Sequence, residues 1–98
     1  MKNILSYSGT QPSGEDYSEC TDIMSKVDDL APSDSHVDAV IKLLTDGTYH
    51  TTIAINAICG NFQSQAKTRT LVSSLKQAQR SMLAILAEWK GTRFENPA

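Results

Sequence analysis

Apolar residues recur at intervals of three and four along two stretches of the chain, which is the spacing of one face of an α-helix. The first stretch has a stripe made of Tyr17, Cys20, Met24, Val27 and Ala31. Ser13, with Asp16 three residues later, forms a helix start, and Pro32 ends the segment because proline disfavours helical geometry in the residue before it. The pattern predicts a helix over about residues 15–31.

The second stretch lies near the C-terminus and begins somewhere between Asn61 and Lys67. Its seam follows a 4-3-4-3-4 spacing and consists of Leu71, Leu75, Ala78, Met82, Ile85 and Trp89. Gly91 ends the predicted helix. Because further leucines widen the seam, the last turns are apolar on several sides, which indicates a central position or a subunit interface. The candidate oligomer interface consists of Met82, Leu83, Leu86 and Trp89.

The middle of the chain fits two patterns. Val37, Val40, Ile41 and Leu44 have helical spacing, and a helix that continued through Gly47 would end naturally at Gly60-Asn61. Against this, residues 48–55 are rich in β-branched side chains, which favour strands. We favour a helix over about residues 36–59, kinked or split at Gly47, and keep a strand as the alternative.

These segments predict an all-α fold, a small antiparallel helical bundle of three main helices. Residues 1–14 contain Gly9, Pro12 and Gly14 and are expected to form a flexible arm. Its apolar residues Ile4, Leu5 and Tyr7 either dock on the body or add a short strand. Residues 15–91 then form the helical bundle domain, and residues 92–98 form a flexible tail.

Charge is distributed unevenly along the chain, although the net charge is only −2. Nine acids lie between Glu15 and Asp46, whereas six bases lie between Lys67 and Arg93. In a bundle, an acidic first helix would attract a basic third helix. The sequence pI of about 5.5 argues against direct nucleic-acid binding, because a chain with net negative charge is repelled by phosphates.

The sequence offers no familiar catalytic chemistry. It contains no nucleotide-binding, zinc-protease or serine-hydrolase motif, so we expect a protein that is not an enzyme and needs no cofactor or metal. Cys20 and Cys59 are interpreted as buried, reduced thiols, with a bridge between them as the alternative. No stretch is apolar enough for a membrane span, and the N-terminus does not look like a secretory signal. These observations predict a cytoplasmic protein.

Two groups of polar residues are candidate binding sites. Asp22, Asp28, Asp29 and Tyr49 are the candidates for contacting a protein partner, whereas Arg69, Lys76 and Arg80 share one helical face that suits an anionic ligand.

The leading functional hypothesis is a non-enzymatic helical interaction protein that binds and inhibits or regulates a macromolecular partner. In this general character, and by no particular motif, the chain resembles accessory proteins of phages and mobile elements. The alternatives are an oligomeric binder or sponge for a small anionic ligand such as a nucleotide, and an assembly subunit that works by homo-oligomerisation.

Overall fold

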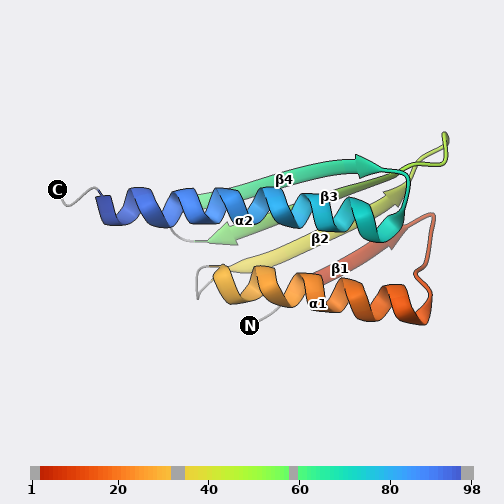
Figure 1. Ribbon diagram of the computed structural model, residues 1–98, viewed down its shortest axis with the longest axis horizontal. Coiled ribbons are helices and arrows are strands. Elements are labelled where there is room, and N and C mark those ends of the chain that lie inside the picture. Colours follow the sequence, from red (N-terminus) through yellow and green to blue (C-terminus); the bar gives the residue numbers. More distant parts are fainter. Residues whose placement is uncertain (1–2, 32–34, 58–59, 96–98) are drawn as a thin grey trace.

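The computed structural model describes residues 3–31, 35–57 and 60–95 and consists of two layers (Figure 1). One layer is a four-stranded sheet, and the other contains two helices. The elements follow the chain in the order β1 (Asn3–Ser8), α1 (Gly14–Leu30), β2 (His36–Leu43), β3 (Tyr49–Ala57), β4 (Gly60–Thr68) and α2 (Leu71–Glu95).

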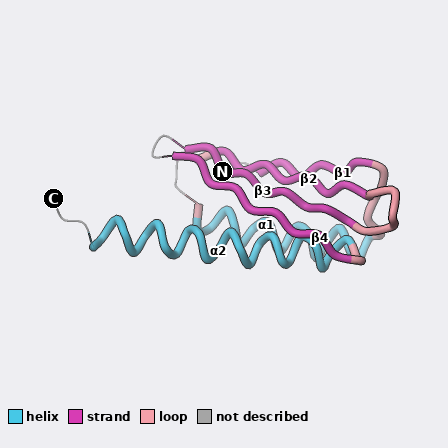
Figure 2. Tube along the Cα trace, turned by 90° about the horizontal axis from the view of Figure 1, so that it is seen from above, coloured by secondary structure: helices cyan, strands magenta, loops and turns pink. Residues whose placement is uncertain are grey.

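The strands lie in the sheet in sequence order, β1-β2-β3-β4. β1 pairs with β2 in parallel, which requires a crossover connection, and α1 supplies it. The other two pairs are antiparallel. Both helices cover the same face of the sheet, and no described helix or strand covers the other face (Figure 2). α1 lies along the β1–β2 side, and α2 lies along the β3–β4 side (Figure 1).

The core lies between the sheet and the helices. Every second residue of the central strands is buried: Val37, Ala39 and Ile41 on β2, and Thr51, Ile53 and Ile55 on β3. The helices close the core with Cys20, Ile23, Met24 and Val27 on α1 and with Leu71, Leu75, Ala78, Met82 and Leu86 on α2. This alternation sends the intervening strand residues to the uncovered face.

The all-α prediction is wrong, because the segment assigned to one long helix forms β2 and β3. Asp46-Gly47 does not kink a helix but turns the chain between the two strands: Gly47 has a φ of 86°, and its N–H donates to the carbonyl of Leu44. The strand alternative for residues 48–55 was therefore correct. Every second residue along β2 is buried, so the apolar residues of this segment follow the two-residue period of a strand rather than the period of a helix.

The flexible N-terminal arm is also a wrong prediction, because residues 3–8 form β1. Residues 60–68, where the C-terminal helix was expected to begin, form β4 instead. The two long helical patterns did predict real helices. α1 starts with Ser13, whose hydroxyl accepts from the N–H of Asp16, and α2 continues through Gly91 to Glu95.

The predicted oligomer interface has a different role in this fold. Met82 and Leu86 are almost fully buried, and they face the sheet rather than solvent. The ring of Trp89 packs edge to face on Phe62 of β4, with centroids 5.7 Å apart. Leu83 is partly buried. The extra apolar residues at the end of α2 therefore pack within the same chain, and their presence does not support a homo-oligomer.

Candidate functional site

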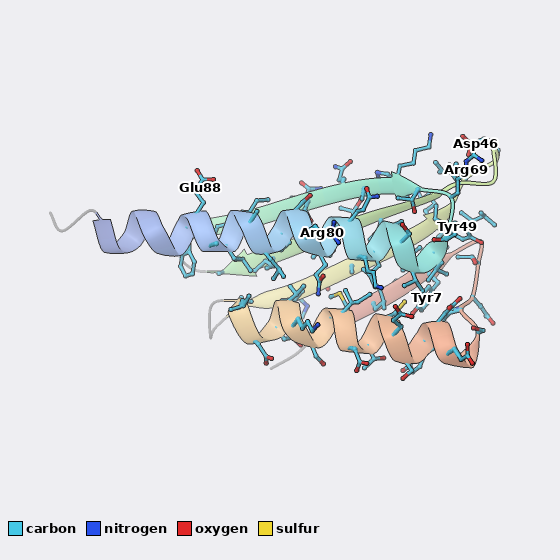
Figure 3. The ribbon with its side chains drawn as sticks, in the orientation of Figure 1. Tyr7, Asp46, Tyr49, Arg69, Arg80 and Glu88 are labelled. Carbon is cyan, nitrogen blue, oxygen red and sulfur yellow. The ribbon has the colours of Figure 1, made fainter. Side chains whose placement is uncertain are left out.

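Charge is separated across the width of the molecule. The exposed side of α1 carries Glu15, Glu19, Asp22 and Asp29 against the single base Lys26. The opposite long side is formed by β4, the β4–α2 connection and the first half of α2 (Figure 1). It carries Lys67 at the end of β4, and Arg69 and Arg80, which Figure 3 labels. A charged partner therefore meets a different local potential on each side.

The residues predicted to contact a protein partner do not form one surface. Asp22 and Asp29 are exposed on α1, and Asp28 beside them is partly buried. Tyr49 lies on β3, partly buried against the core and close to the start of α2 (Figure 3). The acidic residues and the tyrosine therefore belong to different parts of the molecule.

The predicted basic stripe is divided in two. Lys76 points toward α1, where its Nζ lies 2.9 Å from Oε2 of Glu19. Arg69 and Arg80 are exposed, and among the described residues neither forms an ion pair. We call Arg69 and Arg80 the basic edge, because they flank β4, the last strand of the sheet.

An open groove lies along this edge. Gln65 and Ala66 of β4 and Gln77, Arg80 and Ser81 of α2 line a volume of about 350 Å³. Its lining side chains are mostly polar, and one of them is cationic. The amides and the hydroxyl can donate and accept hydrogen bonds, while Arg80 offers a planar fork that suits phosphate or carboxylate.

A second group of basic residues crosses the uncovered face of the sheet. Lys42 of β2 pairs directly with His50 of β3, and His50 pairs with Lys67 of β4. We call these three residues the open-face row. Nε2 of His50 lies 3.2 Å from Oε1 of Gln65. Sequence analysis missed this row, because its members are far apart in the chain and meet only through the strand register.

The β2–β3 turn places one acid beside the open-face row. Oδ2 of Asp46 lies 3.5 Å from Nζ of Lys67, and Oδ1 accepts from the N–H and hydroxyl of Thr48. These hydrogen bonds, with a smaller contribution from Lys67, lower the pKa of Asp46. Figure 3 shows Asp46 and Arg69 at the same end of the molecule.

A smaller cleft lies between β1 and α1. It has a volume of about 200 Å³ and is lined by Leu5, Tyr7, Tyr17, Thr21 and Met24. Burial raises the pKa of Tyr7 to about 12, helped by the neighbouring Cys20 thiol. The buried Tyr7 hydroxyl has no partner of hydrogen-bond geometry among the described residues.

Cys20 itself is a reduced, buried thiol. Burial also raises the pKa of this thiol, so it stays protonated and weakly nucleophilic at neutral pH. The other cysteine, Cys59, lies outside the described residues, as would the bridge considered between them. Within the described ranges, no group of three or more His, Cys, Asp and Glu side chains could hold a metal ion. No described helix has the length and apolar character of a membrane span.

No protein-family model matches the sequence, and no curated protein matches it. Solved structures do match the fold. The N-terminal domain of Protein Y from Thermus thermophilus superimposes with a TM-score of 0.72 at 9% identity, covering 88% of this chain and 94% of that one. A ribosomal subunit interface protein from Coxiella burnetii gives 0.74 at 8% identity, covering 92% and 99%.

These matches confirm a sheet-and-helix fold and overturn the function inferred from a helical bundle. The prediction of a helical inhibitor resembling phage accessory proteins is wrong, because it rested on an all-α bundle, whereas this chain and the matching structures share a sheet-and-helix architecture. The alternative ligand sponge required an oligomer of helical hairpins, and such hairpins are absent from the described residues.

Proposed function

We propose that this protein binds the ribosome and that the basic edge, Arg69 and Arg80, contacts ribosomal RNA. The proposal is supported by a fold likeness that spans nearly the whole of both chains and includes a ribosomal subunit interface protein. The observation that carries it within this chain is the separation of charge, which leaves Arg69 and Arg80 exposed and without an ion pair among the described residues.

The average charge of the chain does not argue against this partner. The acidic pI reflects α1, which carries Glu15, Glu19, Asp22 and Asp29 and lies on the side of the molecule away from β4 (Figure 1). An RNA phosphate approaching the groove along β4 meets Arg80 and neutral amides instead. Local potential rather than net charge decides such an encounter, and α1 would disfavour the opposite orientation.

The proposed activity is binding alone. Arginine forks on phosphate are charge-assisted and need no cofactor, so the expectation that the chain is not an enzyme stays a prediction compatible with this function. A cytoplasmic location is part of the proposal, because a protein that binds ribosomes acts where they are.

The test compares two variants that each remove two positive charges. Arg69→Gln/Arg80→Gln removes the basic edge, and Lys26→Gln/Lys76→Gln removes two lysines of the helical layer. Each fluorescently labelled protein is titrated with purified ribosomes. We expect the first variant to lose at least about tenfold in affinity, because a charge-assisted contact contributes roughly 1.5–3 kcal/mol. The second is expected to bind like the wild type.

Two results would overturn the proposal. One is a wild-type protein that does not bind ribosomes at low salt. The other is an equal loss of affinity in the two variants, which would show that the basic edge has no particular part in the contact.

A further inference from the structure

We infer that the uncovered face of the sheet contacts RNA phosphates through the open-face row of Lys42, His50 and Lys67. This inference rests on the proposed function and deepens it, because it states which face of the molecule lies against the RNA and what the protein recognises there.

The first argument is the register. The three side chains project from directly paired positions on β2, β3 and β4, so they stand side by side on one face. Neighbouring strands are roughly 4.8 Å apart, so the row is about 10 Å long. Lys42 and Lys67 are exposed at its two ends, and His50 between them is partly exposed. This arrangement presents a line of donors across the strands.

The second argument is the electrostatic cost of the row. Lys42 and Lys67 stand about 10 Å apart on either side of His50, a separation at which two cations still repel at low salt. Asp46 relieves only the Lys67 end, at 3.5 Å in an exposed pair. The other acid on this face is Asp38, four residues along β2 from Lys42. Its Oδ1 lies 3.5 Å from Nε2 of His36. An anionic partner would offset the repulsion.

The third argument is continuity with the basic edge. Gln65 belongs to the open face, where its side chain contacts His50, and it also lines the groove beside Arg80. β4 is the edge strand, so no further strand separates the two surfaces. One RNA backbone can therefore follow the open-face row and pass around β4 to Arg80.

The composition of the uncovered face indicates what is recognised. Alternation with the core places fifteen described residues there: Ile4, Ser6, Ser8, His36, Asp38, Val40, Lys42, His50, Thr52, Ala54, Asn56, Asn61, Gln63, Gln65 and Lys67. None is Phe, Tyr or Trp, and the two histidine rings are engaged by neighbours, His36 by Asp38 and His50 by Gln65. Reading of unpaired bases usually depends on stacking against aromatic rings. Beside the apolar Ile4, Val40 and Ala54 and the acid Asp38, the face offers cations, hydroxyls and amides, which suit the sugar-phosphate backbone.

The experiment adds a third variant, Lys42→Gln/Lys67→Gln, to the ribosome titration. It is matched to Lys26→Gln/Lys76→Gln, since each pair contains one lysine in an ion pair and one that forms no ion pair with any described residue. We expect the open-face variant to bind ribosomes at least about tenfold more weakly than the wild type, while the helical-layer variant binds normally. Circular dichroism checks that both variants keep the fold.

A salt series gives a second readout. Wild type and open-face variant are titrated with labelled oligouridylate and oligoadenylate of about 20 nucleotides at increasing KCl. Losing two phosphate contacts should reduce the slope of log affinity against log salt by about 1.4. The two oligomers should bind with similar affinity, because no base is read.

The outcomes separate the two claims. If the wild type binds ribosomes and the open-face variant binds equally well, this inference is overturned and the proposed function stands. A strong preference for one oligomer would overturn the backbone contact. If the wild type does not bind ribosomes at all, the proposed function fails, and this inference fails with it.

Discussion

Thr51 of β3 and Ser74 of α2 are joined by a hydrogen bond inside the core, with 2.7 Å between their hydroxyl oxygens. Both residues are completely buried. The Ser74 hydroxyl donates to the carbonyl of Leu71, 2.8 Å away, so it accepts from Thr51. This contact fixes the start of α2 on the sheet, and α2 in turn carries Arg80.

Removing the Ser74 hydroxyl is expected to destabilise the protein more than removing the Thr51 hydroxyl does. Ser74→Ala leaves the buried Thr51 donor without its partner and should cost about 1–3 kcal/mol, whereas Thr51→Val removes the donor itself and should cost about 0.5–1.5 kcal/mol. The double variant should cost less than the sum. Urea denaturation measures all three free energies of unfolding, and strictly additive losses would contradict the contact.

Sequence reasoning predicted the parts of the fold whose periodicity is long and unambiguous. α1 and α2 each repeat an apolar face over several turns, and both exist. β2 was misassigned because Val37, Val40 and Ile41 fit a helical spacing as well as an alternating one. The structure buries Val37 and Ile41 but exposes Val40, which contributes to the uncovered face.

The sequence of β4 contains almost no pattern that predicts a strand. Its inward positions are Phe62, Ser64 and Ala66, of which only Phe62 is large and apolar. Ser64 can be buried because its hydroxyl donates to the carbonyl of Ala78 on α2, at 2.8 Å. A tertiary hydrogen bond thus replaces the apolar side chain that a pattern search would need.

The Tyr7 hydroxyl gives a prediction about alkaline pH. The pKa of Tyr7 is raised from 10.0 to about 12 by burial, so the folded state favours the protonated phenol. The free energy of unfolding is therefore unaffected by this group below pH 10 and falls as the pH rises from 10 to about 12, because the unfolded state ionises first. We expect Tyr7→Phe to flatten this part of the stability profile, measured by denaturation at successive pH values. An unchanged profile would contradict the burial of the phenol.

At neutral pH, Tyr7→Phe should not harm the fold. The hydroxyl is buried without a partner of hydrogen-bond geometry among the described residues, so its removal relieves a desolvation cost. The variant should be as stable as the wild type or more stable, by up to about 1 kcal/mol. A clear loss of stability in urea would show that the hydroxyl has a partner.

The ion pair between Lys76 and Glu19 should contribute little to stability. Its atoms are only 2.9 Å apart, but both side chains are about half exposed. A double-mutant cycle with Lys76→Ala and Glu19→Ala should give a coupling below about 1 kcal/mol, decreasing as salt is added. A coupling above about 2 kcal/mol, insensitive to salt, would show instead that the pair holds the two helices together.

The candidate site was only partly accessible from the sequence. Arg69 and Arg80 were found because a helical repeat aligned them, although Arg69 precedes α2. The same repeat included Lys76, which the structure pairs with Glu19. Lys42 could not be grouped with Lys67 from the sequence, because they come together only through the pairing of β2, β3 and β4. Neither β2 nor β4 was predicted as a strand from the sequence.

The most direct test of the account is sedimentation of the wild-type protein with ribosomes through a sucrose gradient. We expect it to migrate with ribosomal particles at about 50 mM KCl and to leave them by about 500 mM, because phosphate contacts weaken steeply with salt. A protein that stays at the top of the gradient at the lower salt concentration would contradict the central claim.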